Sequence, residues 1–129
     1  MKWSATLAAG LMLVTSSCYG QNPIVGRYVG YVTVPGALGD TNVGVEFAIT
    51  EVDELGKVRA SGRYYGIRCQ DDFPMKGRYD GRELRIRSAG KFGPNRDCKI
   101  NFRLVVKGSE LVGHTKGKGR PVWLRKRSD

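Results

Sequence analysis

Short runs of alternating apolar and polar residues constrain the fold of this chain more than any other feature. In the run 43–52, Val43, Val45, Phe47 and Ile49 alternate with smaller or polar residues. A period of two is typical of a β-strand with one buried face, because successive side chains of a strand point to opposite sides. The 18 glycines punctuate such runs. The pattern therefore predicts an all-β chain.

Eight runs fit this description, at 24–34, 43–52, 57–67, 73–79, 82–88, 100–107, 110–116 and 121–125. Tight turns separate most of them, so neighbours along the chain are expected to pair antiparallel. Closing the sheet on itself removes exposed edges that would invite aggregation. We therefore expect a single domain at 21–129, either a small antiparallel barrel of about eight strands or a strongly twisted β-sandwich.

Two turns also predict strand register. Asp80-Gly81 is a preferred two-residue hairpin turn, and the pairs expected from it are Lys76 with Arg85, Gly77 with Leu84, Met75 with Ile86 and Arg78 with Glu83. Gly108-Ser109 is expected to pair Val106 with Leu111, Leu104 with Gly113 and Lys107 with Glu110. In the first hairpin, Met75, Gly77, Leu84 and Ile86 fall on one face.

The first 20 residues form a predicted signal peptide. Lys2 is followed by an apolar run at 5–14 and small residues at 15–20. The apolar run is too short to span a bilayer. Cleavage after Gly20 would leave a free periplasmic or secreted protein, whereas cleavage before Cys18 would leave a lipid-anchored one. Both alternatives place the protein outside the cytoplasm.

Cys69 and Cys98 remain as a pair after either cleavage. In an oxidising compartment such a pair is expected to form a disulfide. It would close a loop of about 30 residues and stabilise the fold by about 3–4 kcal/mol in the chain-entropy model.

Charge is unevenly distributed along the chain, whose formal net charge is +10. Residues 21–56 carry a net charge of −4, whereas 57–127 carry 20 basic against six acidic residues, a net charge of +14. The expected juxtaposition of Lys76 and Arg85 is destabilising by itself, because like charges opposite each other repel. If run 57–67 neighbours the hairpin 73–88, six cations share an outward face: Arg59, Arg63, Lys76, Arg78, Arg85 and Arg87.

A second basic cluster lies near the C-terminus and comprises Lys116, Lys118, Arg120, Arg125, Lys126 and Arg127. Of these, Lys116, Lys118 and Arg120 are candidates for binding an anion. The stretch Gly117-Lys118-Gly119 lacks the spacing of a nucleotide-binding loop. A basic surface can also serve solubility alone.

No catalytic, metal-binding or cofactor motif stands out. His114 is the only histidine and is expected to face Arg103. Asp71 and Asp72 are adjacent, so on a strand they would point to opposite faces. We expect a non-enzymatic, exported barrel that binds an anionic envelope component or a protein partner through its basic face. Lipid headgroups, lipopolysaccharide, acidic glycans and acidic proteins fit this class, and the extracytoplasmic location disfavours nucleic acid.

Two alternatives remain open. Five aromatic side chains fall on the core-facing phase, namely Tyr28, Phe47, Tyr64, Tyr79 and Phe102. An eight-stranded barrel is just wide enough to be filled by such side chains or to hold one small ligand. The protein could therefore be a calycin-like carrier of a small apolar ligand, or an enzyme of unknown chemistry.

Overall fold

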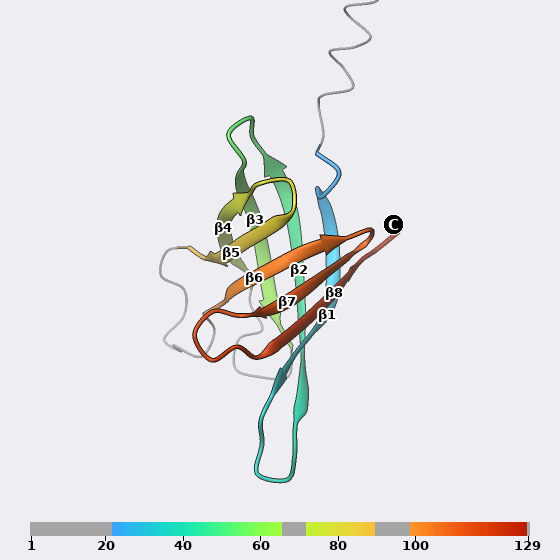
Figure 1. Cartoon of the computed structure of the whole chain (residues 1–129), viewed down its shortest axis with the longest axis vertical. Helices are drawn as coiled ribbons and strands as arrows, with labels where there is room; N and C mark the ends of the chain where they lie inside the picture. The colour runs from blue at the N-terminus through green and yellow to red at the C-terminus, as the bar shows by residue number, and fades with distance from the viewer. Residues whose placement is uncertain (1–21, 66–71, 90–98, 129) are drawn as a thin grey trace, which may run out of the picture.

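A closed barrel of eight antiparallel strands makes up this protein (Figure 1). The structure, a computed structural model, describes residues 22–65, 72–89 and 99–128. Each strand pairs with the next along the chain, and the last pairs with the first. Of the two predicted architectures, the barrel is thus confirmed and the sandwich is not. The predicted signal peptide with Cys18, and also Cys69 and Cys98, lie outside the described residues.

The strands lie within a few residues of the predicted runs. They are β1 (Gly26–Val34), β2 (Thr41–Val52), β3 (Lys57–Tyr64), β4 (Phe73–Tyr79), β5 (Glu83–Ser88), β6 (Asn101–Lys107), β7 (Glu110–Thr115) and β8 (Pro121–Lys126). The connections 53–56, 80–82 and 108–109 lie at one end of the barrel, here called the turn end. The connections 35–40 and 116–120 lie at the opposite end, here called the mouth end, where the β1–β2 hairpin reaches furthest (Figure 1).

Inward-facing side chains from all eight strands fill the barrel. On β3, Val58, Ala60 and Tyr64 are buried while Arg59 and Ser61 are exposed, as the alternation predicts. Four of the five expected core aromatics are buried, and the fifth, Tyr79, packs partly buried against the core. Because the interior is apolar, the charged side chains of the strands lie on the outer surface.

Three strand glycines, Gly30, Gly77 and Gly113, lie where a neighbouring strand comes unusually close. A Cβ atom at Gly77 would lie 1.9 Å from the carbonyl oxygen of Arg85, and one at Gly113 would lie 1.9 Å from the carbonyl oxygen of Arg103. No carbon atom tolerates such a contact with backbone. Glycine therefore permits the close strand approach that this small barrel requires.

The register predicted for the β4–β5 hairpin is wrong by two residues. Lys76 faces Arg87 instead of Arg85, and Arg78 faces Arg85 instead of Glu83. Likewise, Gly77 faces Ile86 instead of Leu84, and Met75 faces Ser88 instead of Ile86. Because the partners shift by two positions, each side chain keeps its predicted face.

The hydrogen bonds of Asp80 explain this difference. Its carboxylate accepts the backbone N–H groups of Arg82 and Glu83 at 2.9 and 2.8 Å. The turn is therefore centred on Gly81 and Arg82. The predicted Asp80-Gly81 turn would need a positive φ at Asp80, and among the described residues only glycines, including Gly81, have one.

The register predicted for the β6–β7 hairpin is confirmed. Lys107 faces Glu110, Val106 faces Leu111, Leu104 faces Gly113 and Arg103 faces His114.

Candidate anion-binding face

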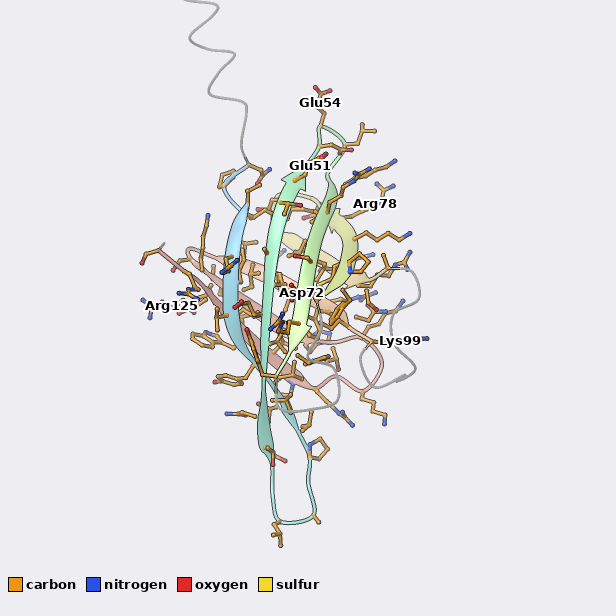
Figure 2. All side chains as sticks on the ribbon, turned by 180° about the vertical axis from the view of Figure 1, so that it is seen from behind. Glu51, Glu54, Asp72, Arg78, Lys99 and Arg125 are labelled. Atoms are coloured by element: carbon orange, nitrogen blue, oxygen red, sulfur yellow. The ribbon has the colours of Figure 1, made fainter. Side chains whose placement is uncertain are left out.

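Five of the six predicted cations on the outward face gather over β3, β4 and β5. They come together because β3 neighbours the β4–β5 hairpin in the barrel. The gathered residues are Arg59, Lys76, Arg78, Arg85 and Arg87, and all are exposed. In Figure 2, Arg78 projects from the opposite side of the barrel to Arg125. Arg125, a member of the second basic cluster, therefore lies away from this face.

The cations of this face form two rows that cross the strands. The first row has one member on each of four strands, Lys57, Arg78, Arg85 and Arg103. The second row has one member on each of three strands, Arg59, Lys76 and Arg87. Each member is the register partner of the next in its row. Every step along a row is therefore a pair of like charges placed directly opposite each other, which is destabilising.

Both rows continue toward β7. His114 is the register partner of Arg103 at the end of the first row. In the second row, Asn101 faces Arg87, and the N–H of Lys116 donates to the carbonyl oxygen of Asn101 at 2.9 Å. Asn101, His114 and Lys116 are also exposed.

An open hollow of about 560 Å³ lies over these rows. Its described lining contains the seven row members together with Lys116, and no carboxylate residue. Val58, Gly77 and Ile86 also belong to the lining. The hollow is therefore bordered by eight exposed cationic side chains.

Carboxylates lie near the hollow only at its edges in the described part of the chain. Glu83 accepts a hydrogen bond from Nε of Arg85 at 2.7 Å, and this contact raises the pKa of the Arg85 guanidinium. At the turn end, backbone hydrogen bonds, chiefly from Lys57, lower the pKa of Asp53. Backbone hydrogen bonds from Glu83 and Arg82 lower that of Asp80 in the same way. On the β2 side, Glu51 faces Arg59.

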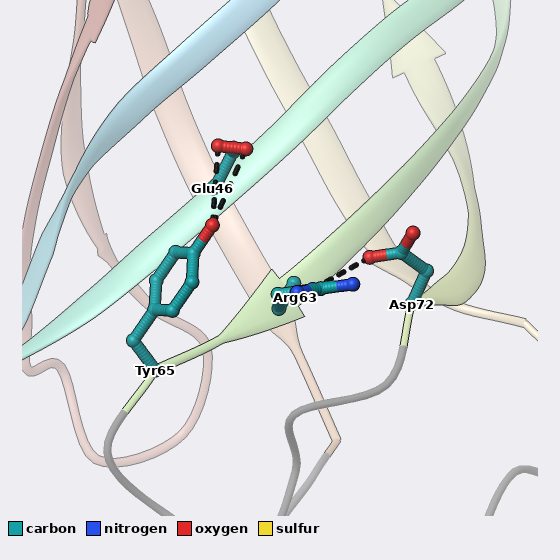
Figure 3. Close-up of polar contacts among 4 residues, drawn as sticks. All are labelled: Glu46, Arg63, Tyr65 and Asp72. Carbon is teal, nitrogen blue, oxygen red and sulfur yellow. Dashed lines mark hydrogen bonds and ion pairs between the residues drawn. The ribbon is translucent and has the colours of Figure 1, made fainter.

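Arg63, the sixth cation predicted for this face, does not line the hollow. Its Nε lies 2.8 Å from a carboxylate oxygen of Asp72, an ion pair that raises the Arg63 pKa (Figure 3). Glu46 on β2 is the register partner of Arg63, and the Tyr65 hydroxyl lies 3.2 Å from the Glu46 carboxylate. Arg63 is ion-paired with Asp72 and lies outside the lining of the hollow, so it is a weaker candidate for an external anion than Arg85, which is ion-paired with Glu83 but belongs to the lining.

The second basic cluster is divided between the two ends of the barrel. Lys116, Lys118, Arg120 and Lys99 line a hollow of about 610 Å³ at the mouth end, together with apolar side chains such as Val32, Tyr64 and Phe102. Toward the turn end, Lys126 donates through Nζ to the carbonyl oxygen of Pro23 at 2.7 Å, and Arg125 faces Glu110. Lys116 lines both hollows, so the basic face and the mouth-end part of the second basic cluster are adjacent.

Sequence reasoning missed Lys57 and Arg103 as members of the face. Alternation alone could have placed Lys57 beside Arg59 on the same side of β3, since a single residue separates them. Arg103 required the pairing of β5 with β6, which are separated along the chain by 89–100. No local signal spans that distance.

The catalytic candidates gain no support from their surroundings. His114 is exposed and faces Arg103 and Pro121. Asp72 is ion-paired with Arg63, while Asp71 lies outside the described residues. In the described part of the chain, no group of three or more His, Cys, Asp or Glu residues could hold a metal ion.

Comparison with known proteins provides no family for this chain. No family model, curated protein or solved structure matches it significantly. Within 22–65, 72–89 and 99–128, no helix has the length and apolar character needed to cross a membrane.

Proposed function

We propose that this protein is an exported, non-enzymatic β-barrel that binds an anionic partner through its basic face. The observation that carries the proposal is the stacking of like charges across neighbouring strands, most clearly Lys57, Arg78 and Arg85. Such pairs oppose folding. An anion over the hollow would neutralise them, so the repulsion would be removed in the complex.

The partner class is an anionic envelope component or an acidic protein. Export, as predicted from residues 1–20, would bring the face into contact with lipid headgroups, lipopolysaccharide phosphates and acidic glycans. Exposed charges interact over about 8 Å at physiological ionic strength. Binding through this face should therefore weaken steeply as salt concentration rises.

Replacing Arg78 with glutamate tests the proposal, because Arg78 lies between Lys57 and Arg85 in the first row. A glutamate there makes two favourable cross-strand pairs in place of two repulsive ones. Urea unfolding should show a stability gain of about a few tenths of a kcal/mol for each pair. Binding to immobilised sulfated polysaccharide, anionic phospholipid vesicles or lipopolysaccharide should weaken.

Arg27→Glu is the matched control. Arg27 is exposed on β1 and faces Ala48. Its replacement by glutamate changes the net charge by the same amount as Arg78→Glu. It should leave binding close to that of the wild type. Equal loss of binding in both variants would show that net charge alone attracts the probe, and unchanged binding in Arg78→Glu would remove the hollow from the proposal.

A carrier function is the second candidate, and the mouth-end hollow favours it. Apolar side chains line it beside four cations, Lys99, Lys116, Lys118 and Arg120. A small apolar ligand could bind there. Native mass spectrometry of the exported protein should then show a retained small molecule, whereas an interaction module should be released empty.

A further inference from the structure

We propose that the anionic partner is a linear polyanion that lies across the strands, along the two rows. This inference rests on the proposed anion-binding function and specifies its ligand. A linear polyanion here means a flexible chain of repeated phosphate, sulfate or carboxylate groups. The geometry of the rows, the chemistry of the hollow and the position of the nearby carboxylates all favour such a chain.

The direction and length of the rows match an extended chain. Both rows run perpendicular to the strands, because their members are register partners on successive strands. Neighbouring strands lie about 4.8 Å apart, so the four strands from β3 to β6 place the first row over roughly 14 Å. The rows lie about 6.6 Å apart, two residues along each strand. One small anion can contact only part of this array and leaves the other repulsive pairs in place.

Among the described residues, the hollow has no cradle for a single small anion. Its described lining offers cationic side chains that are all exposed, and its strand backbones are paired with their neighbours in the ladders. Compact phosphate sites usually add convergent backbone N–H groups. Recognition here therefore depends on many separate charge contacts in series, which a chain of anionic groups supplies.

Carboxylates define where the chain can lie. Glu51 faces Arg59 on the β2 side, and Asp53 and Asp80 lie at the turn end. Glu83, two residues from Arg85 toward the turn end, is ion-paired with Arg85 at 2.7 Å. These groups repel an anion. Lys116 and Asn101 continue the second row away from them. The favourable path therefore starts at β3 and ends beyond β6.

A planar membrane fits this surface less well than a chain. The cations border a hollow, so a flat layer of headgroups would contact the cations without entering the hollow. The carboxylates of Asp53 and Asp80 would repel the part of such a layer that extends past the turn end. A flexible chain can enter the hollow and avoid these groups.

The test compares inorganic phosphate chains of increasing length at one ionic strength. Orthophosphate, tripolyphosphate and long-chain polyphosphate are titrated into the mature protein, with Kd measured calorimetrically and expressed per phosphate. We expect affinity per phosphate to rise steeply with chain length until the chain spans the first row, and then to level off. Binding of the long chain should show a log–log salt dependence that corresponds to several contacts.

Two single substitutions locate the chain. Arg78→Gln, in the middle of the first row, should weaken binding of both tripolyphosphate and the long chain by roughly two- to fivefold, as expected for one exposed ion pair. Arg103→Gln, at the end of the row, should weaken only the long chain, because a short anion can bind over the remaining cations. It should also lower the salt slope by about 1. Arg27→Gln is the control and should change neither.

Each outcome distinguishes this inference from the function on which it rests. Equal affinity per phosphate for orthophosphate and the long chain, or equal effects of Arg103→Gln on short and long chains, overturns the polyanion while leaving anion binding intact. Tight binding of anionic phospholipid vesicles with no binding of polyphosphate or of a polyuronate chain overturns it in favour of a membrane. Absence of binding to every anionic probe overturns both proposals.

Discussion

Tyr28 and Tyr64 show how the barrel changes the chemistry of single residues. Both side chains point into the core, and burial raises the pKa of each phenol from 10.0 to about 12. The Tyr28 hydroxyl also donates to the carbonyl oxygen of Ile24 at 2.9 Å. These phenols are neutral over a wider pH range in the folded protein than in the unfolded chain.

Alkaline pH should therefore destabilise the protein. The folded pKa values lie above the unfolded ones, so the stability that the neutral phenols contribute is fully present below pH 10.0 and is lost as pH rises toward about 12. Urea unfolding across this window should show a loss that approaches about 1.4 kcal/mol per pH unit for each phenol.

Tyr28→Phe is the control for this pH dependence. It should reduce the slope, because one of the two phenols is absent, and cost about 1 kcal/mol at neutral pH through the lost hydrogen bond to Ile24. An unchanged slope in this variant would show that the ionisation of Tyr28 is not linked to unfolding.

At the scale of strands, the close approach of β4 to β5 depends on the absence of a side chain at Gly77. Gly77→Ala would place a Cβ atom 1.9 Å from the carbonyl oxygen of Arg85. The strands must separate to relieve this contact, so we expect a loss of about 1–3 kcal/mol in the free energy of unfolding. Chemical denaturation followed by circular dichroism measures it.

Gly44→Ala is the matched control on β2. A Cβ atom there meets its nearest neighbour, the Cβ of Tyr65, at 3.3 Å, a tight contact with a side chain instead of backbone. Its stability should change by less than that of Gly77→Ala. If the two variants are equally destabilised, the close strand approach is not what selects glycine at position 77.

At the scale of the whole molecule, two covalent features predicted from the sequence lie outside the described residues. The first is the Cys69–Cys98 disulfide. The strand ends that flank the two cysteine-bearing segments, Tyr64 with Phe73 and Ser88 with Asn101, lie at the mouth end. Non-reducing mass spectrometry of the exported protein should show this bond, and its reduction should cost about 3–4 kcal/mol. Two free thiols would contradict the prediction.

The second covalent feature is the attachment of a lipid at Cys18. If Cys18 carries a lipid, the wild-type protein should fractionate with membranes, and Cys18→Ala should move it to the soluble fraction. A soluble wild-type protein whose first residue is Gln21 would instead establish cleavage after Gly20. The polyanion experiment applies in both cases, because the barrel begins downstream at Gly26.

The sequence by itself determined the strands and their faces. Alternation in a strand such as β3 is local, because the pleat sends neighbouring side chains to opposite sides whatever the strand pairs with. For the same reason, Arg78 and Arg85 could be placed on the outer surface before their partners were known. The Gly108-Ser109 turn also set its own register, since its neighbours pair directly across it.

Only the tertiary structure decided which charges meet. The carboxylate of Asp80 moved the β4–β5 register by accepting two backbone N–H groups, a choice between turn geometries that the Asp-Gly dipeptide does not specify. Pairing between β5 and β6 brought Arg103 into the first row, whereas Asp72 drew Arg63 into an ion pair. These contacts join residues that are distant in sequence, or select one of several possible partners for the same group. Which contacts form therefore depends on the closed barrel and not on any local pattern.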